Sequence, residues 1–425
     1  MERNIGSNVE QVRINNRKAI LNLIKDNGPM PRKDIADATG LSPGTITVLT
    51  NEMIAQGILT EIGPADQSVQ NKAGRKKILV DINYQHKYVA GVSIEYDYIH
   101  IGISDLKGDV LASDKIETDR SISPEECLKN IAVRVKLLFW NLNLSRETML
   151  GIGVTIIGIV DQEKGISLDT FGMWDRPVPV KEILERECET RVVVNNNVRA
   201  LALAEVDIES AGESCANSIF FIRHGYGIGA AIINDGEIYY GHSNSAAEFG
   251  HMVVDKNGPL CFCGKRGCIG AIASQRKIID DISKLFSKER TPELYAVCGG
   301  DPENIMVETI RDSIARNDRE IAELIRDRAE MLGKYISMCF EILDTQRVVL
   351  YGRFFALELF LKHVIDEMRV GITGFQENMV CVSRLNNTTA YFGGIAIVLR
   401  ELFYTGRWDL CEQAAEKSGS EMAAD

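Results

Sequence analysis

The chain has 425 residues, a hydrophobic content of 45% and a formal net charge of −12 at pH 7. This length predicts two or three domains with a sizeable core, and no apolar run approaches the length of a membrane span. The ten cysteines do not follow the paired spacing of a disulfide framework, which favours a reducing compartment. Since the N-terminal stretch also lacks the apolar segment of a signal peptide, a cytoplasmic location is expected.

The charge is unevenly distributed along the chain. Residues 1–87 contain 12 Lys or Arg and nine Asp or Glu, so the whole acidic excess lies in the remainder. A mildly basic first domain on an acidic body fits a protein whose first domain alone meets DNA. A charge excess this small is also common on a solvated surface.

The first 60 residues have the pattern of three helices. Residues 14–27 are amphipathic, and a second, short helix is expected over 32–38. Ser42 and Pro43 suit the N-cap and first position of a third helix that ends near Gln56. A short helix, a glycine-bearing turn and a capped helix make the helix-turn-helix pattern, whose last helix enters the DNA major groove.

A hairpin is expected to follow these helices. Residues 58–62 and 77–82 read as its two strands, which would complete a winged helix-turn-helix. The polar connection between them contains Arg75 and Lys76 after a glycine, and these cations are expected to contact phosphates or the minor groove. The plain alternative is a solvated loop tip.

From about residue 88 the pattern changes to strand pairs followed by helices. The expected strands cover 88–94, 98–104, 149–160, 192–194, 218–222, 229–233 and 348–350. The expected helices cover 124–142, a segment from about 198, most of 308–343 and the end of a last strand–helix unit near 390–405. Strand pairs followed by helices, twice over, predict two α/β lobes around a cleft.

Within the second half, residues 248–268 read EFGHMVVDKNGPLCFCGKRGC. Cys261, Cys263 and Cys268 fall within eight residues, and His251 stands ten residues ahead of the first. One imidazole and three thiolates are a common tetrahedral set for a structural zinc ion, and the interspersed glycines let the chain fold back. Buried free thiols beside an unrelated histidine are the alternative. Their crowding between glycines favours zinc.

This stretch resembles the Glu-x-Gly-His and Cys-x-Cys-Gly-x-x-Gly-Cys motifs of the ROK family, which groups bacterial repressors and sugar kinases. The resemblance implies an actin-like, ribonuclease-H-like sugar-kinase fold, with zinc on His251, Cys261, Cys263 and Cys268. It further implies that Glu248 and His251 hold a sugar. The family usually has another Glu two residues after the last Cys, where this chain has Gly270.

The first domain also resembles the winged helices of ROK repressors, whose third helix often reads Ser-x-x-Thr-Val-Ser-Arg. This chain has SPGTITV over residues 42–48, so a valine replaces the frequent arginine. Base recognition is therefore expected from Ser42, Thr45, Thr47, Val48 and Asn51, with the valine suited to a thymine methyl group.

The motifs of ROK kinases are altered. Their ATP-phosphate turn, Asp-x-Gly-Gly-Thr, matches residues 93–97, SIEYD, in which two carboxylates and a bulky ring would repel a phosphate. Their catalytic Asp, in Asn-Asp-x-x-Ala, matches Asn197, whose neutral amide cannot accept a hydroxyl proton near pH 7. Residues 225–229 keep glycines but place Tyr226 where the kinases have Thr. These differences predict that the chain is not an enzyme.

The polar groups expected at a sugar are better kept: Asn196, Asn197, Glu248 and His251. Trp174 either packs against a sugar face or belongs to the core. The predicted domains are a winged helix-turn-helix over 1–86, a first α/β lobe over 87–197 and a second lobe with the zinc-binding loop over 198–425.

We therefore expect a transcription regulator, most simply a repressor, that binds double-stranded operator DNA as a homodimer or a dimer of dimers. A small sugar-like effector would control it from a degenerate kinase cleft, and no membrane partner is expected. The alternatives are a sugar kinase with an appended DNA-binding domain and a regulator controlled by a protein partner.

Overall fold

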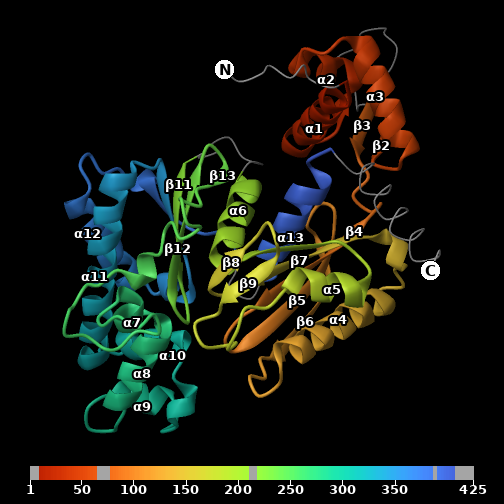
Figure 1. Cartoon of the computed structure of the whole chain (residues 1–425). Coiled ribbons are helices and arrows are strands. Elements are labelled where there is room, and N and C mark those ends of the chain that lie inside the picture. The colour runs from red at the N-terminus through yellow and green to blue at the C-terminus, as the bar shows by residue number, and fades with distance from the viewer. Residues whose placement is uncertain (1–8, 65–76, 210–217, 386–389, 407–425) are drawn as a thin grey trace.

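The computed structural model describes residues 9–64, 77–209, 218–385 and 390–406. A small head, formed by the start of the chain, sits on a body of two α/β lobes (Figure 1). No helix in these described ranges combines the length and the apolar composition that a membrane crossing requires.

The head has the predicted winged helix-turn-helix arrangement. Its elements are α1 (Val9–Asn27), β1 (Met30–Pro31), α2 (Arg32–Thr39), α3 (Pro43–Ala55), β2 (Leu59–Pro64) and β3 (Ile78–Ile82). β2 and β3 pair as an antiparallel hairpin, and β1 adds a short third strand that the sequence did not predict. Ser42 is the N-cap of α3, because its side chain accepts a hydrogen bond from the Thr45 amide at 3.1 Å.

The first lobe contains a five-stranded sheet in the order β10-β7-β4-β5-β6. Its elements are β4 (Tyr88–Ile94), β5 (Tyr98–Asp105), β6 (Val110–Glu117), α4 (Pro124–Asn141), β7 (Met149–Ile156), β8 (Ile159–Asp161), β9 (Ile166–Asp169), α5 (Val180–Cys188) and β10 (Val192–Asn196). α4 and α5 pack on one face of this sheet. All but the first residue of β4 are buried, since both faces of the sheet are covered.

The second lobe repeats this topology. Three antiparallel strands, β11 (Ile219–His224), β12 (Ile228–Asn234) and β13 (Glu237–Ile238), are extended on the β11 side by parallel β14 (Arg347–Tyr351) and β15 (Val380–Val382). Its outer helices are α7 (Ile269–Ala273), α8 (Gln275–Leu285), α9 (Pro292–Val297), α10 (Val307–Ala315), α11 (Arg319–Leu343) and α12 (Glu358–Gly371). The prediction of two similar α/β lobes is confirmed.

Two helices lie between the sheets (Figure 1). α6 (Asn197–Glu209) packs on the sheet of the second lobe, and α13 (Phe392–Val398) packs on β4 and β7 of the first. The approach is close, since a Cβ on Gly394 would lie 2.4 Å from the Gly153 carbonyl oxygen. The predicted domain boundary at residue 197 places α13 in the second lobe. In the structure this helix covers the sheet of the first lobe.

The end of the described chain differs from the sequence prediction. Where a strand–helix unit was expected near 390–405, α13 is followed by a π-helical turn, Leu399–Phe403, and the preceding strand is β15. The apolar run near 390 was read as a strand because periodicity alone does not separate a short buried strand from a buried helix.

Candidate functional site

A cleft of about 440 Å³ lies between the two lobes. Its walls come from the turn after β4, the β10–α6 junction, the segment before α7 and the first turn of α8. One end holds the residues predicted to contact a sugar, and the other holds the stretch that matches the kinase phosphate turn. We call these the sugar end and the nucleotide end.

At the sugar end, Asn196 organises the start of α6. Its Oδ1 accepts hydrogen bonds from the amides of Val198 at 2.9 Å and Arg199 at 3.2 Å, and its Nδ2 donates to the Gly158 carbonyl at 2.8 Å. Asn196 lines the cleft, but its polar atoms already have partners within the chain. It thereby fixes the position of the next residue.

Asn197 has a different environment. It lines the cleft, is only 3% exposed, and its Nδ2 has no hydrogen-bond partner in the described part of the chain. A buried donor without an acceptor is costly, so such a group in a cleft wall is suited to an acceptor on a ligand. An oxygen of a polyhydroxyl compound would supply one.

Glu248 and His251 face each other across the same end. The Glu248 Oε2 and His251 Nε2 atoms are 4.0 Å apart. Desolvation in the cleft raises the pKa of Glu248, although the Arg199 and Lys265 charges oppose the rise. Phe171 packs edge-on against the His251 ring with centroids 5.1 Å apart. The pair can donate to and accept from neighbouring hydroxyls beside an apolar ring.

The other side of the His251 ring faces the cysteines. Its Nδ1 lies 3.5 Å from Cys261 Sγ, and the sulfurs of Cys263 and Cys268 are 3.6 Å apart. All four ligand atoms lie within 4.8 Å of one another. Two sulfurs bound tetrahedrally to one zinc ion at about 2.3 Å would be about 3.8 Å apart. The four residues therefore fit a zinc ion.

The backbone around the cysteines explains how they meet. Short hydrogen bonds close the loop, including Cys261 N to Lys265 O and Gly267 N to Pro259 O, both at 2.8 Å. Gly267 has φ +67°, and a Cβ there would lie 1.4 Å from the Asp255 carbonyl oxygen. No side chain fits at that position, so the glycine is required for the loop to close.

The nucleotide end is closed by an ion pair between the lobes. Glu95, just after β4, pairs with Arg223 of β11 at 2.5 and 2.6 Å. Burial alone would raise the pKa of Glu95, but the charge and hydrogen bonds of Arg223 lower it below its ordinary value. The Glu95 carboxylate thus lies in the segment, residues 93–97, that matches the phosphate turn of the kinases.

Aromatic rings reinforce this closure. Tyr96 stacks on Tyr226 of the opposite lobe with ring centroids 4.6 Å apart and planes inclined by 25°. The guanidinium of Arg276 lies 4.6 Å from the Tyr226 centroid, and that of Arg120 lies 4.4 Å from the Tyr96 centroid. The four side chains form a stacked column where a kinase would need open space for phosphates.

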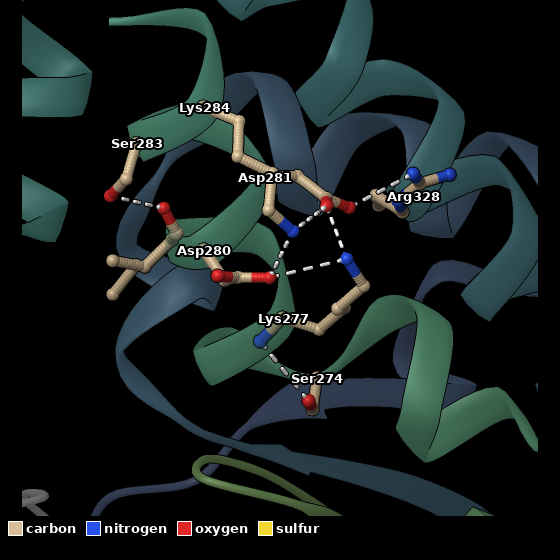
Figure 2. Close-up of polar contacts among 8 residues, drawn as sticks. Ser274, Lys277, Asp280, Asp281, Ser283, Lys284 and Arg328 are labelled. Carbon is tan, nitrogen blue, oxygen red and sulfur yellow. Dashed lines mark hydrogen bonds and ion pairs between the residues drawn. The ribbon is translucent and has the colours of Figure 1, made fainter. Parts of the chain in front are cut away.

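A lysine at the edge of the cleft is also neutralised within the chain. Figure 2 shows Lys277 of α8 directed towards Asp280 and Asp281 of the same helix. Asp281 in turn pairs with Arg328 of α11 at 3.3 Å, and Asp280 pairs with Lys284 at 2.6 Å. Alternating charges on α8 and α11 therefore hold this ammonium group in a closed network (Figure 2).

On the head, α3 presents the residues predicted to meet DNA. Thr47, Val48 and Asn51 lie on its outer surface, opposite the core residues of the helix, and Val48 is 57% exposed. Asn51 accepts a hydrogen bond from Arg32 at 3.0 Å, while Ser42 and Thr45 bond to each other at the start of the helix. Arg75 and Lys76 lie outside the described residues.

Comparison with known proteins agrees with this geometry. The model of the ROK family matches residues 89–401, and a model of winged helix-turn-helix DNA-binding domains matches residues 15–60. The chain belongs to the ROK family.

ROK regulators are similar to the whole chain. The xylose repressor of Caldicellulosiruptor bescii is 26% identical over 391 residues, which are 91% of this chain and 96% of that protein. A crystal structure of a ROK family transcriptional regulator, a homologue of the Escherichia coli MLC protein, has a TM-score of 0.76 at 22% identity, covering 95% of this chain and 99% of that one.

A ROK kinase is similar to the body alone. The ROK family glucokinase of Streptomyces griseus, in complex with glucose and AMPPNP, has a TM-score of 0.64 at 24% identity. The likeness covers 74% of this chain and 99% of the kinase. The repressor-like similarity includes the head, whereas the kinase similarity concerns the fold of the lobes. The predicted combination of a winged helix-turn-helix with a sugar-kinase fold is confirmed.

Sequence reasoning missed several residues of the ROK cleft. It did not find Arg223, because the sequence gives no sign that β11 would place this side chain against Glu95, 128 residues away. It considered Trp174 for the sugar face, but that ring packs against the core of the first lobe, and Phe171 lines the cleft. Phe171 has a positive φ of 52°, and the pattern of the neighbouring residues does not indicate the direction that its side chain then takes.

Proposed function

We propose that this chain is a sugar-responsive transcription repressor of the ROK family. Its head would bind double-stranded operator DNA, and the sugar end of the cleft would hold a sugar or sugar derivative. The observation that carries this proposal is a cleft whose sugar end holds the buried Nδ2 of Asn197, without a partner among the described residues, while an ion pair and stacked rings of the chain cross its nucleotide end.

The sugar end supports a polyhydroxyl ligand in three ways. Asn197 has an amide nitrogen without a partner among the described residues, Glu248 has a carboxylate acceptor, and His251 has the ring nitrogen that faces away from the cysteines. Gly270 lines the same wall, where the family usually has a Glu. The ligand would therefore make one polar contact fewer than in family members that keep this Glu.

We further propose that His251, Cys261, Cys263 and Cys268 bind a structural zinc ion. Zinc would fix the loop that carries His251, so that the Nε2 atom stays directed into the cleft. Removal of zinc with a chelator should weaken sugar binding while the head stays folded. Calorimetric titration and circular dichroism of the metal-free protein check this, and an unchanged sugar affinity would refute the role.

DNA binding would use the outer surface of α3. Ser42, Thr45, Thr47, Val48 and Asn51 are the proposed base-facing residues. Arg75 and Lys76 would add contacts to phosphates or the minor groove. Two heads of a homodimer, or of a dimer of dimers, would meet a pseudo-palindromic operator. A cytoplasmic location follows from operator DNA as the partner.

The experiment that tests the function measures operator affinity with and without sugar. A duplex enriched from a random pool by the purified chain supplies the operator, and fluorescence anisotropy gives its Kd. D-xylose, D-glucose and N-acetylglucosamine are the first probes, followed by their phosphates. We expect one sugar to weaken operator binding about tenfold or more. The proposal fails if no sugar changes the Kd, or if no duplex is enriched.

The control variant for this experiment is Glu248→Gln. It leaves α3 untouched, so the operator Kd without sugar should stay that of the wild type. The sugar effect should shrink, because the carboxylate acceptor is lost.

A further inference from the structure

The helix α6 links the sugar end of the cleft to the head. Its first residue, Asn197, lines the cleft, and Asp207, near the other end, contacts the head. These two residues are ten positions apart, which corresponds to roughly 15 Å along a helix. One rigid element therefore spans the distance between the proposed effector and the DNA-binding domain.

The contact with the head is a small charged junction of four residues, Lys25, Asp207, Arg400 and Tyr404. Lys25 Nζ, near the end of α1, lies 3.2 Å from Asp207 Oδ1, and Arg400 Nη1 lies 3.5 Å from the same oxygen. Lys25 Nζ also lies 4.8 Å from the ring centroid of Tyr404. Lys25 and Asp207 are both 24% exposed, so water screens their pairing only partly.

The head is seated on the body by apolar packing beside this junction. The buried residues of α1 share one core with the C-terminal segment, which contributes Tyr391, Ile395, Val398, Leu399 and Phe403. That segment also touches α6, because a Cβ on Gly393 would lie only 3.1 Å from the Cβ of Ala200. A shift of α6 would therefore reach the head through both the junction and α13.

We propose that α6 transmits occupancy of the cleft to the head, with Asp207 and Lys25 as the coupling pair. This inference rests on the proposed function. A sugar that accepts a hydrogen bond from Asn197 would favour one position of the first turn of α6. The ion pair at the other end would link the position of α6 to the seating of α1. The differential affinity of the sugar for the two arrangements then becomes a change in operator affinity.

If Asp207 and Lys25 couple the two sites, removing the pair has an effect on coupling that the loss of a purely structural contact would not have. Asp207→Asn keeps the size and shape of the side chain but removes its charge. The operator Kd without sugar, the sugar Kd without DNA and the melting temperature should stay close to those of the wild type, since a partly exposed pair adds little stability. The factor by which sugar weakens operator binding should fall roughly threefold or more.

Three further variants make the test specific. Lys25→Gln should lower the coupling factor like Asp207→Asn, and the double variant should lower it no further than the stronger single one, because both act through one contact. Asp366→Asn is the matched control: it removes a carboxylate that pairs with Lys362 at 2.6 Å on α12, away from cleft and head. Its coupling factor should equal that of the wild type.

The measurement is operator anisotropy with and without saturating sugar, repeated as calorimetry of the sugar with and without operator. D-xylose, D-glucose and N-acetylglucosamine are the probes. Both directions must give the same factor, since coupling between two ligands is reciprocal. An Asp207→Asn protein that couples as strongly as the wild type overturns the inference alone. A wild-type protein whose operator affinity no sugar changes overturns the proposed function, and this role of α6 with it.

Discussion

The two ends of the cleft differ in how their polar side chains are paired within the chain. At the sugar end, the buried Nδ2 of Asn197 has no hydrogen-bond partner in the part of the chain that the structure describes, and Glu248 Oε2 lies 4.0 Å from His251 Nε2. At the nucleotide end, Glu95 pairs with the Nη2 atom of Arg223 across the lobes, and Tyr96 and Tyr226 stack, although Arg223 Nε has no hydrogen-bond partner among the described residues. The difference teaches that one cleft can leave polar groups available at one end while side chains of the same chain pair and stack across the other.

The largest expected effect comes from a variant that breaks the ion pair at the nucleotide end. In Arg223→Met, Glu95 is left as an uncompensated carboxylate whose side chain is 18% exposed. We expect the free energy of unfolding, measured by urea denaturation, to fall by about 3 kcal/mol. The Glu95→Gln/Arg223→Met double variant should recover part of this loss, because no buried charge remains. Equal losses in the two proteins would show that the ion pair does not close the nucleotide end.

The next effect concerns His224, the neighbour of Arg223 on β11. Burial lowers the pKa of His224 to about 4, even though a hydrogen bond with the Ala273 carbonyl opposes the shift. The unfolded chain takes up this proton at a higher pH, near 6.5, than the folded chain does. Stability is therefore complete above about pH 6.5 and is lost as the pH falls towards 4. Between pH 7 and pH 5 the loss is about 2 kcal/mol.

Denaturation of His224→Gln checks this contribution. The variant should lose less stability than the wild type between pH 7 and pH 5, while the exposed control His242→Gln should follow the wild type. If His224→Gln and the wild type lose stability in parallel, the imidazole is not held neutral in the core of the closed end.

The smallest expected effect comes from a variant at the sugar end. Asn197→Ala removes an amide whose Nδ2 has no partner among the described residues, so no described hydrogen bond of this nitrogen is lost. We expect sugar affinity, measured by calorimetry, to weaken roughly fivefold to tenfold, with little change in the melting temperature. A variant that binds sugar like the wild type would mean that Asn197 does not face the ligand. In that case the two ends would be less different than proposed.

Local patterns predicted the head and the main strands of both sheets, but not β6, α5, α8, α9 or α12. Ser42 and Pro43 marked the start of α3, and alternating strand pairs and helices indicated the two lobes, because capping and periodicity are properties of neighbouring residues. The close spacing of Cys261, Cys263 and Cys268 likewise placed their sulfurs within reach of one another.

Contacts between distant segments could not be predicted in this way. The packing of α13 on the first lobe depends on glycine contacts such as Gly394 against Gly153, which join segments 241 residues apart. Asn196 is expected to contact the sugar and lines the cleft, but that its amide also caps α6 depends on the turn that follows it and could not be predicted from the sequence. The sequence showed that the kinase motifs were altered, and the structure shows what occupies their place.

The most direct test of the central claim is a calorimetric titration of the zinc-loaded protein with magnesium-ATP and, separately, with the sugar panel. The account predicts that a sugar binds without nucleotide, and that magnesium-ATP gives no binding heat and no sugar phosphate, because Glu95 pairs with Arg223 and Tyr96 stacks on Tyr226 across the nucleotide end. Binding of magnesium-ATP, or its turnover with any sugar, would contradict the claim that this end is closed.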